Sequence, residues 1–335
     1  MDPLSQAVIG AALPQSLART SEARAALTLG ALSGMAPDLD VLVQSPTDPL
    51  LFLEFHRQFT HSLVFIPIGA LVCAVAFYPV ARRFITFRRA YFFCLLGFST
   101  HGLLDACTSY GTQLLWPFAI TRVAWNNISV VDPILTLPAL VLIAAASWRR
   151  SLPLARVALC WVLIYLTIGV FQRDRAYEAG AEIAASRGHT PERLEVKPGF
   201  GNLLLWKAIY EVDGVYYVDA IRMGVSARVY PGASIHKLDV ARDFTWLDPD
   251  SQQAIDIERF RWFSSDFLGV RGDEVLDVRY SVVPNEIDPL WSIKLAKAAA
   301  SGDHVDWITR RSAGADQRGS ITAMLRGKSL APSHR

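Results

Sequence analysis

Histidines and aspartates recur in three short motifs within the first third of this 335-residue sequence. Imidazole and carboxylate groups are the ligands that zinc, manganese and iron take in proteins, so these motifs could build a transition-metal site. The motifs are PDLD at 37–40, HRQFTH at 56–61 and HGLLD at 101–105, and the predicted metal ligands in them are Asp38, Asp40, His56, His61, His101 and Asp105.

The spacing within HGLLD is that of one helix face. His101 and Asp105 are four residues apart, so on a helix the pair could bind one divalent ion or bridge two. His101 lies well inside an apolar run, where a polar group is costly unless it pairs or coordinates. A hydrogen bond that only ties helices together is the alternative, and the motif alone leaves both open.

The other two motifs need loops to act as ligands. His56 and His61 are five residues apart and turn inward together only where a loop enters a helix, whereas Asp38 and Asp40 point the same way on an extended backbone. Taken alone, each motif fits a structural role, as interfacial histidines or as a helix cap. Taken together, six ligands exceed the need of one tetrahedral ion and predict a two-metal site whose ions share a carboxylate, ~3.5–4 Å apart.

Arg57 stands between the two histidines of the second motif. Its guanidinium could hold a phosphate or a carboxylate, with anchoring in the lipid headgroup region as the alternative. We therefore predict catalytic roles for Arg57, His101 and Asp105. The expected cofactor is one or two divalent transition-metal ions, zinc first.

The elements that would position these residues are membrane helices. Hydrophobic residues make up 52% of the chain and the mean hydropathy is +0.26, which is typical of membrane proteins. Basic residues in the loops 81–89 and 149–156 predict that these loops are cytoplasmic. A weaker segment, 23–43, would bring the total to four or five membrane helices. The four clear apolar segments are 62–80, 90–107, 131–148 and 157–171.

The sequence changes character after residue 172. Asp213-Gly214 between two strand-like runs predicts a type I′ hairpin, and further strand-like and helical stretches follow. We expect a helical membrane domain over 1–172, a small α+β domain over 173–320 on the extracytoplasmic side, and a flexible tail over 321–335.

Charge and cysteine content exclude other classes. The formal net charge of +2 predicts no nucleic-acid partner. The four cysteines have no metal-finger spacing and are expected to be buried small hydrophobes. The opening MDPLSQ does not read as a cleavable signal peptide.

PDLD, HRQFTHS and HGLLDACTSYGTQLLWPF, together with the apolar segments, resemble the bacterial inner-membrane family of membrane-bound metal-dependent hydrolases, including its LexA-regulated type. The resemblance covers about residues 1–170. A weaker similarity links the His and Asp distribution to zinc-dependent phospholipase C. The resemblance implies an inner-membrane, multi-pass protein whose metal-site residues are the six named above.

The function expected from these features is hydrolysis of an ester or phosphoester by a metal-activated water. A site at the membrane boundary makes membrane lipids the expected substrate. One alternative is a non-catalytic membrane protein whose His/Asp cluster is structural and whose outer domain binds an envelope partner. Ion transport ranks third, because the inner halves of the apolar segments 62–80 and 90–107 lack polar groups.

Overall fold

The computed structural model describes residues 1–330 and divides into two compact units, each discontinuous in sequence. The N-terminal unit comprises Met1–Val43, Phe55–Phe171 and Phe200–Asn202. The C-terminal unit comprises Gln44–Glu54, Gln172–Gly199 and the described residues from Leu203 on.

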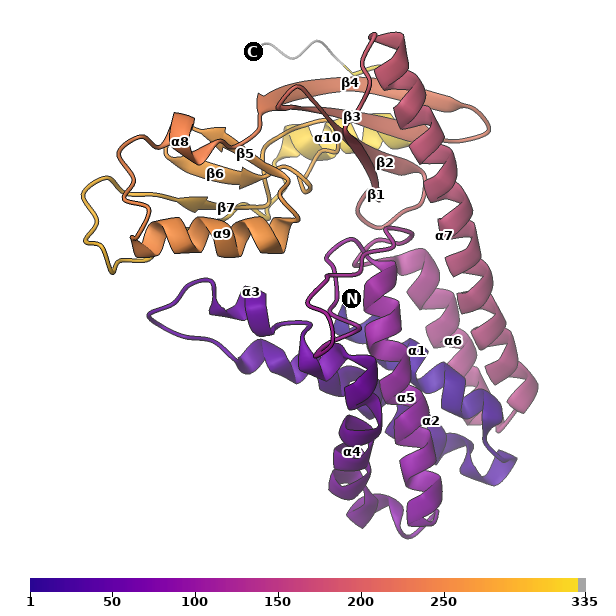
Figure 1. Cartoon of the computed structure of the whole chain (residues 1–335). Helices are drawn as coiled ribbons and strands as arrows, with labels where there is room; N and C mark the ends of the chain where they lie inside the picture. The colour runs from indigo at the N-terminus through magenta and orange to yellow at the C-terminus, as the bar shows by residue number, and fades with distance from the viewer. Residues whose placement is uncertain (331–335) are drawn as a thin grey trace. The chain divides into compact units, whose positions relative to one another are not determined.

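The N-terminal unit is a helical bundle (Figure 1), in which α1, α2 and α5 pack on one another and α4 packs on α5. Short 3-10 helices at Thr20–Glu22, Ala36–Leu42, Phe59–His61 and Leu63–Phe65 connect or extend the main helices. The main helices of this unit are α1 (Pro3–Leu17), α2 (Ala23–Met35), α4 (Ile66–Ala81), α5 (Phe87–Cys107), α6 (Pro133–Arg149) and the part of α7 (Leu152–Ser186) up to Phe171. The short helix α3 (Leu51–Phe55) belongs, except for Phe55, to the C-terminal unit.

Three helical segments are long and apolar enough to cross a membrane, namely Leu63–Ala81, Phe87–Cys107 and Leu152–Ser186. α6 is apolar but has only 17 residues. The segment 23–43 forms the 13-residue α2 followed by a 7-residue 3-10 helix, and each of these alone is shorter than the ~20 residues that a spanning α-helix needs. α7 joins the apolar segment 157–171 and the charged stretch after it into one helix, because no proline interrupts the chain between Pro153 and Pro191.

Glycines allow α1, α2 and α5 to approach backbone to backbone. A Cβ atom on Gly30 of α2 would lie 2.4 Å from the carbonyl oxygen of Gly10 in α1, and one on Gly97 of α5 would lie 2.5 Å from the carbonyl oxygen of Gly30. Small residues at such crossings permit close helix packing in membranes. The crossing fixes α5 against α2, whose last residues precede the PDLD motif.

Polar side chains define other helix ends of the bundle. Asp132 caps α6 by accepting hydrogen bonds from the backbone N–H groups of Ile134 and Leu135, with Pro133 in the first turn. The hydroxyl of Tyr165 in α7 also donates to Asp132, at 2.8 Å. Among the cysteines, Cys160 of α7 is exposed rather than buried as expected, because it lies on an apolar helix face without a protein neighbour to cover it, while the other three are buried.

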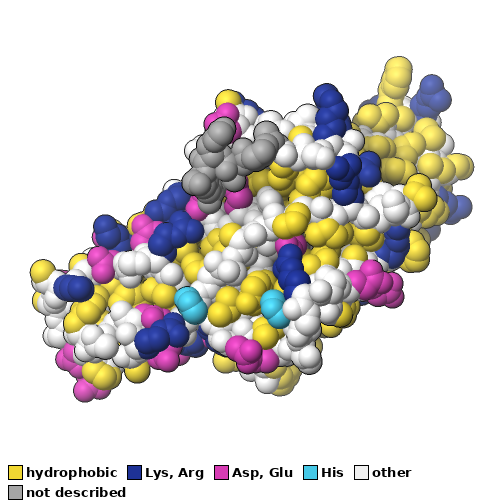
Figure 2. All heavy atoms as spheres, turned by 90° about the horizontal axis from the view of Figure 1, so that it is seen from above, with side chains coloured by type: hydrophobic (Ala, Val, Ile, Leu, Met, Phe, Trp, Pro, Cys, Tyr) yellow, Lys and Arg dark blue, Asp and Glu magenta, His cyan; other side chains and the backbone are white. Residues whose placement is uncertain are grey.

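The C-terminal unit contains two four-stranded antiparallel sheets with strand orders β1-β2-β3-β4 and β5-β6-β7-β8. Basic and acidic side chains are interspersed with apolar ones on the face of the molecule shown in Figure 2. The strands are β1 (Arg193–Pro198), β2 (Leu205–Val212), β3 (Val215–Met223), β4 (Ala227–His236), β5 (Leu268–Arg271), β6 (Glu274–Asp277), β7 (Trp291–Lys294) and β8 (Asp306–Thr309).

The predicted hairpin is present between β2 and β3. Asp213 and Gly214 both have positive φ, 50° and 68°, as a type I′ turn requires. Helix α9 (Gln252–Ser264) packs on the second sheet through Phe263, whose ring lies 6.4 Å from that of Trp291. A short helix, α8 (Val240–Asp243), precedes α9.

The last helix, α10 (Ala315–Leu325), enters the stretch 321–335 that was expected to be flexible. Met324 is fully buried in an apolar cluster with Leu205 of β2 and Tyr230 of β4, and this burial holds the helix in place. The end of the expected tail, 331–335, lies outside the described residues.

The segment Gln44–Glu54 belongs to the C-terminal unit although it lies between two of the His/Asp motifs. Arg259 of α9 forms ion pairs with Asp48, at 2.8 Å, and with Glu54 of this segment. The ring of Phe52 lies 5.4 Å from that of Trp307, edge to face. Charge pairing and aromatic packing therefore fix the segment within the C-terminal unit.

We predict that Gly30→Ala destabilises the helical bundle. Alanine normally stabilises a helix relative to glycine, by up to ~1 kcal/mol, but here the added methyl meets backbone and should cost ~1–3 kcal/mol. Thermal unfolding of the purified protein in detergent measures the effect. Gly319→Ala in α10 is the control, since nothing lies within 4 Å of its Cβ position. A melting temperature for Gly30→Ala equal to or above the wild-type value would contradict this account of the packing.

Candidate metal centre

Four predicted ligands converge at one end of the helical bundle. Asp38, His61, His101 and Asp105 each offer one ligand atom, and these atoms lie within 4.8 Å of one another. A second group of Asp38, Asp40 and His56 meets the same criterion and shares Asp38 with the first. The structure therefore brings together all six residues, and Asp38 belongs to both groups.

His101 is oriented by the helix that crosses its own. Its Nδ1 atom lies 2.5 Å from the carbonyl oxygen of Gly34 in α2, and a carbonyl can only accept, so Nδ1 carries the proton. The Nε2 atom is then left as an acceptor directed into the cluster, which is how backbone carbonyls orient metal-binding histidines.

His61 is held in the same way by a carboxylate. Its Nδ1 atom lies 3.2 Å from Asp40 Oδ2, and its Nε2 atom lies 3.2 Å from Asp105 Oδ2 and 3.5 Å from Asp38 Oδ1. The Nε2 atoms of His61 and His101 are 2.8 Å apart. Two imidazoles therefore present the same ring nitrogen to one point beside the carboxylates of Asp38 and Asp105.

The electrostatics of the cluster favour a cation. Burial by itself would lower the pKa of His61, but the neighbouring carboxylates of Asp105, Asp38 and Asp40 outweigh burial and raise this pKa to about 10. Burial would raise the pKa of Asp38, yet its contacts with His101 and His61 hold it well below the usual carboxyl range. In the metal-free protein His61 is thus an imidazolium at neutral pH, and a bound metal ion would replace its proton.

Asp105 carries the clearest sign of a missing partner. Its side chain is fully buried on the last turns of α5, and its Oδ2 atom accepts no hydrogen bond from any described residue. Arg57 Nε and His61 Nε2 lie 3.1 and 3.2 Å from this oxygen, but neither is aligned for a hydrogen bond. A buried carboxylate oxygen left in this state is costly, and a divalent ion between it and the two imidazoles would satisfy it. The residues present therefore fit a transition-metal ion.

Asp40 differs from the other aspartates. It accepts hydrogen bonds from the backbone N–H of Arg57 at 3.0 Å and the hydroxyl of Thr60 at 2.8 Å, and it contacts both His56 and His61. Because these contacts occupy both of its oxygens, Asp40 is suited to orienting the two histidines. Its predicted role as a ligand stays a prediction.

Arg57 lies inside the cluster. It is 3% exposed, so the alternative of a headgroup-region anchor does not describe its position. Its φ of 68° is in the left-handed region, which is uncommon for a residue other than glycine. Its guanidinium lies 4.7 Å from the ring centre of Tyr110 and donates to Thr108 at 3.2 Å.

Two residues at the start of the chain reach Asp105 as well. The amide nitrogen of Gln6 in α1 donates to Asp105 Oδ1 at 2.9 Å, and the α-amino group of Met1 forms an ion pair with the same oxygen. Sequence analysis missed both. Gln6 carried a usable signal, because it is a polar residue within an otherwise small and apolar run.

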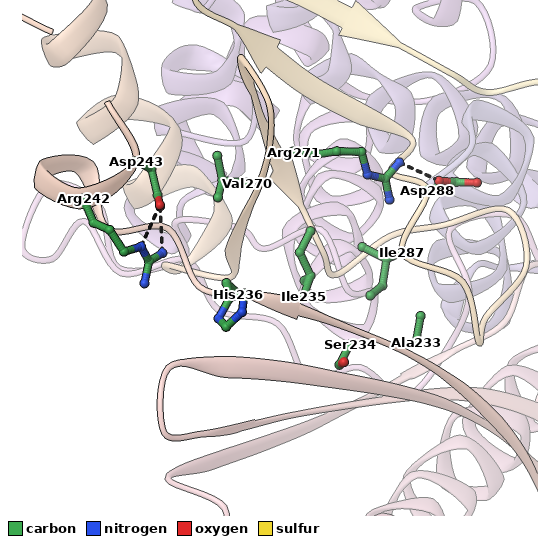
Figure 3. A pocket seen from close by; sticks show the side chains of 10 residues that line it. All are labelled: Ala233, Ser234, Ile235, His236, Arg242, Asp243, Val270, Arg271, Ile287 and Asp288. Atoms are coloured by element: carbon green, nitrogen blue, oxygen red, sulfur yellow. Dashed lines mark hydrogen bonds and ion pairs between the residues drawn. The ribbon is translucent and has the colours of Figure 1, made fainter. Parts of the chain in front are cut away.

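Two side chains of the cluster are partly exposed to solvent. Those of Asp38 and His56 are 22% and 20% exposed, whereas those of His61, His101 and Asp105 are fully buried. The C-terminal unit has a separate pocket of about 620 Å³ (Figure 3), where Arg242 is paired with Asp243 and Arg271 with Asp288. No predicted site residue lines that pocket.

The fold and the cluster define a helical membrane protein with a buried His/Asp centre able to hold a metal ion. The sequence model of a family described as YdjM inner membrane protein matches residues 1–176, just over half of the chain. The protein belongs to this family, the LexA-regulated inner-membrane family, which confirms the predicted resemblance to the LexA-regulated type and the inner-membrane location.

One relative is similar over part of its length. The uncharacterized protein YfhP of Bacillus subtilis (strain 168) is 29% identical over 123 residues, and the match covers 36% of each chain. The chain thus spans about a third of this relative. No solved structure is significantly similar to the present chain.

We predict that His61→Ala and His101→Ala each weaken metal binding by at least ~100-fold, since loss of a ligand should exceed the 10–100-fold cost of losing a ligand's support. Metal content is measured by elemental analysis after growth with added zinc, manganese and iron. His236→Ala in the C-terminal unit is the matched control. Wild-type protein that holds no stoichiometric metal after this treatment would refute the metal centre.

Asp38 and Asp40 should respond differently to the same change. Asp38→Asn removes the carboxylate that both groups share and should abolish binding at the cluster, whereas Asp40→Asn should weaken affinity by ~10–100-fold, as loss of an orienting group does. Competition with a chelator of known affinity gives both values. Equal losses would assign Asp40 a ligand role.

Proposed function

We propose that the protein is a metal-dependent hydrolase that cleaves an ester or phosphoester bond of a membrane lipid. The observation that supports it most is the convergence of Asp38, His61, His101 and Asp105 on one point, with Asp105 Oδ2 lacking a hydrogen bond there. Buried ionisable groups at the end of a membrane helix are functional candidates, because an unused charge at that depth is costly.

A bound divalent ion would supply a water of lowered pKa and positive charge for the leaving oxygen. His61 and His101 hold their Nε2 atoms at the point where the ion would sit, through Asp40 and Gly34. Zinc suits this set of imidazoles and carboxylates, as do manganese and iron.

Arg57 would bind the anionic part of the substrate. Its guanidinium is already beside Asp105 and over Tyr110, so little reorientation is needed to hold a phosphoester oxygen. His56 is the partly exposed histidine of the cluster, with Nδ1 held by Asp40 at 2.7 Å. Its Nε2 atom is available to give a proton to the leaving group.

The surroundings favour a lipid over a soluble metabolite. Leu63, Val64 and Ile68, at the start of the candidate span that follows His61, are exposed apolar side chains. A lipid lying against this surface would have its headgroup at the level of the cluster. We propose in addition that the C-terminal unit is extracytoplasmic.

A non-catalytic role is the second candidate, because the same contacts also brace the bundle. The bond from His101 to Gly34 joins α5 to α2, and Asp40 joins the two loop motifs. In that case the C-terminal unit would bind an envelope partner and the cluster would be structural.

The test uses full-length protein loaded with zinc, manganese or iron and presented with phospholipids and a prenyl phosphate in mixed micelles, beside water-soluble esters. We expect turnover of a lipid, loss of at least ~100-fold for His61→Ala, and a ~10–100-fold fall in kcat/KM for Arg57→Gln with metal retained. His236→Ala is again the control. Turnover of soluble esters alone would refute the lipid substrate, and stoichiometric metal without turnover of any of them would favour the bracing role.

A further inference from the structure

A groove of about 470 Å³ lies between α2 and α4. Its apolar wall includes Leu32 of α2, Phe77 of α4 and Phe84 of the loop that follows α4. Its volume is within the ~300–1,000 Å³ typical of small-molecule sites. None of the six predicted metal ligands lines this groove.

The basic end of the groove is at the other end of the helices from the cluster. The groove is lined by α2 from Arg24 to Leu32 and by the last turns of α4, whereas Asp38 follows α2 and His61 precedes α4. Because Arg24 is in the first turn of α2, the 13 residues of this helix separate it from Asp38 by ~20 Å along the axis. A ligand bound here would therefore not be the substrate of the cluster.

Arg24 and Arg150 contribute positive charge to this apolar groove, and Ser21 contributes a hydroxyl. Neither arginine forms an ion pair with any residue in 1–330, whereas Arg89 of α5 is paired with Glu22 at 2.6 Å. Two guanidinium groups without acidic partners beside an apolar wall complement a molecule with an anionic head and a hydrocarbon chain.

The groove also opens where such a molecule would be found. Val80 and Phe84 at its edge are exposed apolar side chains, as expected of a surface in contact with lipid. The basic loops 81–89 and 149–156 belong to the same end of the bundle, and short basic loops mark the cytoplasmic side. Basic pockets between membrane helices on that side bind anionic lipid headgroups.

We infer that this groove is a binding site for an anionic phospholipid of the cytoplasmic leaflet. The phosphate contacts Arg24, Arg150 and the hydroxyl of Ser21, and one acyl chain lies along Leu32 and Phe77. The bound lipid fills the space between α2 and α4 and so supports the packing of the bundle. This inference does not depend on hydrolysis at the other end.

Delipidated full-length protein in detergent, titrated with phosphatidylglycerol or phosphatidylcholine and observed by native mass spectrometry, tests the site. The wild type should retain one phosphatidylglycerol at concentrations where phosphatidylcholine is lost. The double variant Arg24→Gln/Arg150→Gln should bind phosphatidylglycerol about tenfold or more weakly, since each basic residue near a lipid surface contributes severalfold.

Two comparisons separate the groove from general surface charge. Arg82→Gln/Arg83→Gln removes the same charge from the neighbouring exposed loop, outside the groove, and should change binding less than about threefold. Ala76→Phe keeps every charge but fills the groove, and should weaken binding as much as the double arginine variant. Equal loss in the Arg82/Arg83 variant, full binding in Ala76→Phe, or equal retention of both lipids by the wild type would overturn the inference.

Metal content of each variant, measured on the same preparations, reports whether the bundle has kept its fold. A variant that loses lipid but keeps wild-type metal content places the effect in the groove. Failure of hydrolysis assays would leave this result unchanged, because the readout is lipid retention and not turnover.

Discussion

The buried charge of Asp105 is the constraint on which the N-terminal unit depends. A carboxylate on the last turns of an apolar helix cannot be left without compensation. The structure surrounds it with the guanidinium of Arg57, the amide of Gln6, the α-amino group of Met1 and the imidazole of His61. These groups come from two separate stretches of the chain, 1–6 and 57–61, so stabilising one charge also fixes how both stretches meet α5.

Glycine packing makes this arrangement geometrically available. His101 can reach the carbonyl of Gly34 because Gly30 and Gly97 let α2 and α5 come together without side chains between them. A larger residue at the crossing would move the imidazole away from the carbonyl that orients it. Gly30 and Gly97 therefore affect the site only by setting the distance between α2 and α5. The one atom that a glycine contributes to the contacts described here is the carbonyl oxygen of Gly34.

Much of the site could be predicted from sequence, since His and Asp within apolar segments conflict with burial unless they meet. That reasoning placed His101 and Asp105 on one helix face and correctly grouped them with the other two motifs. It could not separate the roles of Asp38 and Asp40, because their difference arises from backbone and hydroxyl donors such as Thr60 that carry no periodic signal. The same reasoning predicts a separate helix over 157–171, because the residues change from apolar to charged at its end. In the structure α7 continues through this change, since neither a proline nor a cap ends the helix there.

The path of the chain has a consequence for how the family region can be divided. Residues 1–176 match the family, yet 44–54 within them packs in the C-terminal unit, where Leu50 and Leu53 are buried and Asp48 is paired with Arg259. A polypeptide ending at 176 would remove the side chains that cover these two leucines and would take Arg259 away from Asp48 and Glu54. The sequence boundary of the family and the physical boundary of the folded units are thus different, and a graft of the membrane region onto another soluble domain would have to replace the partners of that one short segment.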